Sequence, residues 1–266
     1  MPAVIDAHGV FAVFGPYLVA FALVLARITG LMVTAPWFNS QTTPTLVRMG
    51  LVGLLTLFVM IKTGPVPMAG NLDALRLIGL CGLELMVGGL MGTAVALLFG
   101  AIGMAGQLIG TQMGLSMASL MDPISFQQTG LMGQVLNIMA LLLYLVMDGH
   151  LMMLRALFES FQVVPLTHVA PKAALIMPAL IELSGQIFSL GLRIAFPVVV
   201  CVLFVNIGLA IVARTVPQVN VFQLGFIVTV GAGIFVLALS IPSLRVVLQS
   251  LIEESVRAAM GMARAC

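Results

Sequence analysis

The chain has 266 residues, of which 61% are hydrophobic and only 8% are charged, and its mean hydropathy is +1.21. Soluble globular domains carry roughly 25% charged residues, so this composition excludes a soluble enzyme domain. The 11 Lys and Arg residues, set against 9 Asp and Glu, are too few and too balanced to bind a nucleic-acid backbone. A chain this hydrophobic is not disordered either. We therefore expect a membrane-associated, all-α protein.

Six long apolar runs follow one another along the chain and predict about six hydrophobic helical units. They cover residues 9–35, 49–61, 85–121, 131–147, 194–213 and 221–244. The second run has 13 residues and is short for a span, so it fits a hairpin arm or a helix buried in protein. Turn-forming residues separate the units, among them a longer loop marked by Pro165, Pro171 and Pro178.

The last stretch of the chain differs from the rest, because charges recur among its apolar residues. It predicts an amphipathic C-terminal helix or tail over residues 243–266, after a hydrophobic helical domain over residues 1–242. With six spans, the even connections and the tail hold seven Lys and Arg residues, and the odd connections hold two. The positive-inside rule would then place both termini in the cytoplasm.

Charged groups within apolar runs are the usual indicators of a transport path or a proton relay. Here they are scattered rather than clustered: Arg27, Glu84, Asp148, Glu182 and Arg193. Arg27 and Glu84 are the only charges of the first and third units, and we expect each to be partnered, with the other or with a neighbouring subunit. The three His and three Cys residues have no metal-ligand spacing, and no nucleophile motif or phosphate-binding loop occurs. We therefore expect no catalytic residue, no cofactor and no metal.

Small residues form a stripe in the third unit, where Gly106, Gly110 and Gly114 recur every four residues. Such a stripe lets another helix backbone approach closely. Met113, Met117 and Met121 recur at the same spacing on an adjacent face, and methionine packs adaptably. Because each glycine costs ~1 kcal/mol of helix propensity against alanine, we expect this unit not to form one continuous rigid helix.

The segment 105–123, which contains these glycines and methionines and ends in Asp122-Pro123, resembles the signature segment of the FliR family of flagellar export proteins. That family includes the T-type export-apparatus protein of virulence type III secretion. The stretches 27–48, 148–165 and 214–225 resemble further family segments in the same order, so the match covers nearly the whole chain.

The resemblance implies a non-catalytic structural subunit of a flagellar type III export gate, in the bacterial inner membrane and the flagellar basal body. Its implied partners are FliP-like and FliQ-like gate subunits, an FlhB-like switch protein, exported unfolded flagellar proteins and membrane lipid, with no nucleic acid. The implied fold is a set of bent helical hairpins that assemble with these subunits into a helical, pore-containing gate.

By motif match, the resemblance also implies a loop over residues 112–123 that plugs the closed pore. Its candidate residues are Gln112, Met113, Gly114, Leu115, Ser116, Met117, Met121, Asp122 and Pro123. An export subunit of a virulence system is the first alternative. A small-molecule or ion transporter would need internal repeats and a polar midplane site, and a membrane enzyme would need clustered titratable residues; the sequence shows none of these.

Overall fold

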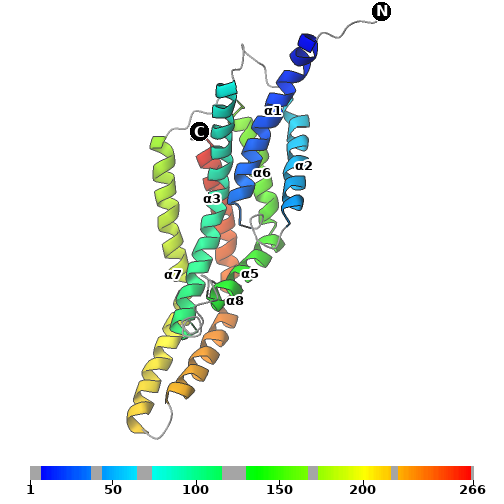
Figure 1. Ribbon diagram of the computed structural model, residues 1–266. Helices are drawn as coiled ribbons and strands as arrows, with labels where there is room; N and C mark the ends of the chain where they lie inside the picture. The colour runs from blue at the N-terminus through cyan, green and yellow to red at the C-terminus, as the bar shows by residue number, and fades with distance from the viewer. Residues whose placement is uncertain are drawn as a thin grey trace, which may run out of the picture. The chain divides into compact units, whose positions relative to one another are not determined.

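The computed structural model describes residues 7–36, 44–64, 74–115, 130–166, 173–216 and 221–264. Over these ranges every regular element is an α-helix, so the predicted all-α fold is confirmed (Figure 1). The helices are α1 (Ala7–Thr34), α2 (Thr45–Thr63), α3 (Ala74–Gln112), α5 (Leu131–Val146), α6 (Gly149–Val163), α7 (Ala173–Thr215) and α8 (Val221–Arg264).

Five of these helices, α1, α2, α3, α7 and α8, are long and apolar enough to cross a membrane. Helices α5 and α6 meet at a short break with a bend of 65°, and together they form a sixth candidate span. The break is at Asp148, whose φ of 56° lies in the left-handed region that ends a helix. The structure thus agrees with about six hydrophobic units.

Several helices are longer than the apolar runs that predicted them, among them α2 and α7. Helix α2 has 19 residues rather than 13, because it extends past Arg48 and Lys62, whose long side chains keep their charges at the helix ends. Helix α7 begins at Ala173, so the expectation that Pro178 lies in a loop is wrong. A proline so close to the start of a helix removes only one backbone hydrogen bond, which a 43-residue helix tolerates.

The third unit, residues 85–121, is not one continuous helix, because α3 ends at Gln112 and Gly114 follows with a φ of +77°. The expected interruption is therefore correct at Gly114 but wrong at the glycines before it. Helix α3 runs without a break for 39 residues and includes Gly106 and Gly110. Several of its glycines lie against the backbone of another helix, and this close packing offsets the low helix propensity of glycine.

The chain divides into two compact units, each built from segments that are distant in sequence. The first contains residues 1–96, 150–181 and 254–266, and the second contains residues 97–149 and 182–253. Helix α8 continues across residue 243, and the division of the chain at residues 242 and 243 stays a prediction.

Each unit has its own buried apolar residues. In the first unit Leu23, Ile28 and Leu31 of α1 are fully buried. In the second unit Ile102 of α3 and Leu136 of α5 are fully buried. The packing within each unit holds its helices, and therefore the sites described below, in place.

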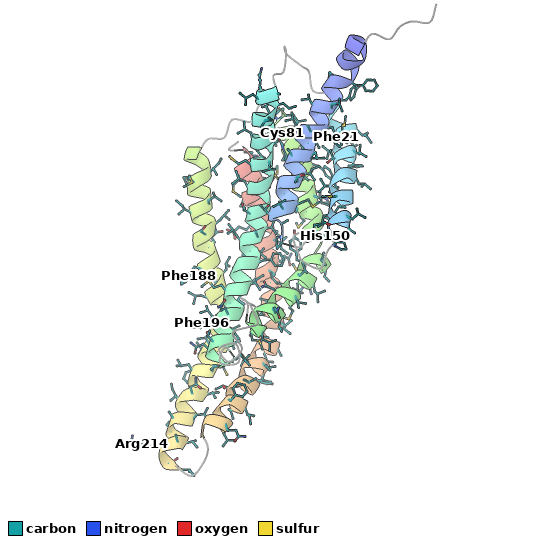
Figure 2. The ribbon with its side chains drawn as sticks, in the orientation of Figure 1. Phe21, Cys81, His150, Phe188, Phe196 and Arg214 are labelled. Atoms are coloured by element: carbon teal, nitrogen blue, oxygen red, sulfur yellow. The ribbon has the colours of Figure 1, made fainter. Side chains whose placement is uncertain are left out.

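Large apolar side chains also cover much of the outer surface. Phe188 and Phe196 project from α7 (Figure 2) and are 59% and 65% exposed. Helices α2 and α8 expose side chains of the same kind, such as Ile61 and Phe235. Surfaces this apolar belong against lipid or against other protein subunits rather than water.

Candidate functional site: a buried ion pair and the end of helix α3

A buried ion pair joins α1 to α3 in the first unit. Arg27 and Glu84 are both inaccessible to solvent, and Arg27 Nε donates to Glu84 Oε2 at 2.5 Å. Of the two arrangements that the sequence left open, the structure has the direct pair. Cys81, one turn before Glu84 on α3, is a free thiol (Figure 2).

Arg27 also holds the end of a third helix, α6. Its Nη1 donates to the hydroxyl oxygen of Ser160 at 3.3 Å, and its Nη2 donates to the carbonyl oxygen of Val164 at 3.1 Å. The Ser160 hydroxyl in turn donates to the carbonyl of Leu157 at 2.7 Å. The guanidinium carbon lies 4.4 Å from the centre of the Phe161 ring, a cation–π contact. The positive charge therefore lies at the carboxyl end of α6, where the helix dipole favours it.

Glycines bring α1 and α3 into backbone contact beside this ion pair. A Cβ on Gly88 would overlap the carbonyl oxygen of Arg27, and a Cβ on Gly30 would overlap the carbonyl oxygen of Leu85. No other residue fits either position without moving a helix. The close approach allows the short reach from Arg27 to Glu84, so the glycines and the charges act together.

In the second unit, the small residues near the end of α3 have different roles. A Cβ on Gly106 would lie 2.5 Å from the Cα of Gly133 on α5, so two glycines meet at this helix contact. At Gly110 the nearest atom would be Met132 Cβ at 3.5 Å, an ordinary van der Waals distance. Gly106 is therefore required by packing, whereas Gly110 has room for a methyl group.

Gly114 ends the helix rather than packing against another one. Its φ is +77°, its N–H donates to the carbonyl of Thr111 at 3.1 Å, and the N–H of Leu115 donates to the carbonyl of Gly110 at 3.0 Å. This pair of bonds is the Schellman motif, in which a glycine in the left-handed conformation closes a helix. The motif fixes where α3 stops.

Only the first residues of the predicted plug lie within the described chain. Gln112 is the last residue of α3, and Met113, Gly114 and Leu115 form the turn that follows. Met113 is 1% exposed, and a Cβ on Gly233 of α8 would lie 2.7 Å from its Cε, so the methionine packs against that glycine. The remaining predicted plug residues lie outside the described residues: Ser116, Met117, Met121, Asp122 and Pro123.

The other charges singled out in the apolar runs do not join these two sites. Glu182 and Arg193 lie on α7 and are exposed, and Asp148 lies at the break between α5 and α6. Within the described ranges, no group of three or more His, Cys, Asp or Glu residues could hold a metal ion.

Sequence reasoning identified the charged pair but missed the groups around it. Ser160 stood out only as part of a family-like stretch, and Gly30 was not singled out, although it lies one turn after Arg27 on α1. Gly133, which packs against Gly106, and Gly233, which packs against Met113, were also missed. A glycine within an apolar helix was the available signal for each of these three.

Comparison with known proteins places the chain in a family. The model of the family "Bacterial export proteins, family 1" matches residues 18–255. The chain belongs to this family. It is 35% identical to the flagellar biosynthetic protein FliR of Pectobacterium carotovorum over 221 residues, which are 81% of this chain and 82% of the relative. It is 29% identical to the FliR protein of Escherichia coli, over 86% of this chain and 87% of the relative. It is also 29% identical to the FliR protein of Bacillus subtilis, over 89% of this chain and 92% of the relative. The resemblance to the FliR family is confirmed.

Proposed function

We propose that this chain is a structural subunit of the flagellar type III export gate in the bacterial inner membrane. The observation that carries the proposal is its similarity, over most of its length, to proteins named flagellar biosynthetic protein FliR. The apolar helices support it, because a gate subunit has to lie in or beside a bilayer. The described residues show hydrogen bonds and close backbone contacts between helices rather than a cluster of titratable groups. This favours a structural role over a catalytic one.

The exposed apolar surfaces support assembly with other subunits. The proposed partners are FliP-like and FliQ-like gate subunits and an FlhB-like switch protein, and the proposed cargo is unfolded flagellar protein. Side chains such as Phe196 and Phe235 are two-thirds exposed, and subunit contacts or lipid would cover them in the assembled gate.

The plug is the finer part of the proposal. The segment 112–123 would close the pore at rest, starting from the Schellman turn at Gly114. A movable segment needs a fixed point of attachment, and the buried Met113 and the two capping hydrogen bonds supply one. From Leu115 to Met121 the segment carries no charge, so it can occupy a closed pore without the cost of burying ions.

Deletion of residues 116–121 tests the plug while leaving the Schellman turn intact. In cells that carry this variant with its native partners, we expect the gate to assemble but the membrane to leak ions, measured as conductance and as poor growth in high salt. The matched control is deletion of six residues, 65–70, from a different connection, which should not cause leakage. An assembled gate that stays impermeable after deletion of residues 116–121 would show that the seal lies elsewhere.

A chromosomal deletion of the whole gene tests the wider proposal separately. We expect loss of motility and of flagellar protein export, both restored by the full chain supplied in trans. Normal export without the chain would contradict the assignment to the gate.

A further inference from the structure

A cavity of about 480 Å³ lies between α2 and α6 in the first unit. It falls within the ~300–1,000 Å³ typical of ligand sites. Its walls come from Phe58 and Val59 of α2 and from Phe158 and Phe161 of α6. The rings of Phe58 and Phe158 lie 5.6 Å apart and hold the two helices together at this point.

The polar residues of the cavity are two, Lys62 and Gln162, and both are exposed. Lys62 is the last residue of the α2 segment that qualifies as a membrane span, so it would lie at the membrane interface if α2 crosses a bilayer. No carboxylate is among the residues that line the cavity. The cavity is thus apolar along its walls, with one positive charge and an amide at its polar end.

We propose that this cavity binds an anionic phospholipid. One acyl chain would lie against the three phenylalanines, and the phosphate would accept hydrogen bonds from the Lys62 ammonium and the Gln162 amide. A basic, apolar pocket between membrane helices is a recognised form of site for anionic lipid. The charge complementarity favours lipid over a helix of a partner subunit, because a purely apolar helix would leave Lys62 without a counter-charge.

Phe161 connects the lipid site to the buried ion pair. The ring lines the cavity and also lies 4.4 Å from the Arg27 guanidinium carbon. A bound acyl chain would therefore pack against the helix end that Arg27 holds. The proposal rests on the chain lying in a membrane and not on its export role.

Photocrosslinking tests the proposal on the full chain, purified with its native partners and reconstituted into phosphatidylcholine nanodiscs. The probe is phosphatidylglycerol with a diazirine on one acyl chain, compared with phosphatidylcholine that carries the same diazirine. Labelled residues are mapped by mass spectrometry. We expect labels on the α2 and α6 segments around Phe58 and Phe158, with about a fivefold preference for the anionic probe, the effect of ~1 kcal/mol per cation.

Three variants make the test specific. Lys62→Gln should reduce the preference to about one, and Lys62→Arg should retain it. Arg76→Gln removes an exposed cation of the same unit that does not line the cavity, so it should change nothing. Equal labelling by the two probes in the unaltered chain, or a preference that survives Lys62→Gln, would overturn the proposal. Absence of label at the cavity in the assembled complex would also overturn it, because a protein partner would then occupy the place.

Discussion

Removal of one member of the Arg27–Glu84 pair should destabilise the chain strongly. In Glu84→Met, the Arg27 guanidinium stays buried and keeps Ser160 and Val164 as its acceptors among the described residues. A buried charge that loses its partner costs ~3–5 kcal/mol. For domains of 150–250 residues, each kcal/mol lowers the midpoint of thermal unfolding by ~2–4 °C, so we expect a decrease of about 6–20 °C.

The double variant Arg27→Met, Glu84→Met separates charge pairing from packing. When both charges of a buried pair are replaced by apolar residues of similar volume, stability is often unchanged or higher. We therefore expect the double variant to recover most of the loss of either single variant. Its remaining deficit should be ~1 kcal/mol, because Ser160 and the Val164 carbonyl lose a donor.

The assay is thermal unfolding of the full chain in detergent, followed by loss of the monodisperse peak of a fluorescent fusion in size-exclusion chromatography. Arg193→Met is the control, because Arg193 is an exposed charge within an apolar helix and its loss should shift the midpoint little. If Glu84→Met unfolds within about 2 °C of the unaltered chain, or if the double variant loses as much as the two single variants combined, the pairing argument is wrong.

Two further predictions concern the end of α3 and use the same assay. Gly106→Ala should lower the free energy of unfolding by ~1–3 kcal/mol, because its Cβ would meet the Gly133 backbone. Gly110→Ala should be neutral or stabilising by up to ~1 kcal/mol, since that site has room for a methyl group. Equal midpoints of thermal unfolding for the two variants would contradict this packing. Gly114→Ala should lower the free energy of unfolding by ~1–2 kcal/mol, because a side chain at a φ of +77° is strained. Gly114→Asn should lower it less, since asparagine tolerates the left-handed conformation better. An equal loss of stability in both variants would argue against the left-handed cap.

The helical units and the charged pair could be predicted from the sequence because their signals are large. Long apolar runs allow few structures other than helices, and a charge within such a run demands a partner. Arg27 and Glu84 therefore stood out before any contact was known. The acceptors Ser160 and Val164 could not be predicted, since a serine and a backbone carbonyl at the end of a helix have no distinctive sequence pattern.

The glycine stripe shows a different limit. Regular spacing predicted one small-residue face from Gly106 to Gly114, yet the three glycines differ in role. Gly106 meets a backbone, Gly110 has free space beside it, and Gly114 caps the helix. Glycine has no side chain and readily adopts a positive φ, so the same residue type occurs both at close helix contacts and in left-handed turns. Only the partner atoms and the dihedral angles separate these uses.

The buried charges also explain how two apolar helices keep one alignment. Inside a bilayer, helices gain little from burying apolar surface against each other, because lipid tails are equally apolar. Gly30, which lies against Leu85, and Gly88, which lies against Arg27, allow α1 and α3 to approach closely, but smooth glycine surfaces alone would permit one helix to slide along the other. Arg27 prevents such a slide, since a shift of one turn, about 5.4 Å, would break its bonds to Glu84 and to the end of α6 together. The pair therefore contributes more to the specificity of the arrangement than to its stability. On this argument the double methionine variant should unfold near the normal temperature and still assemble less completely with its partners, a combination that a purely stabilising ion pair would not produce.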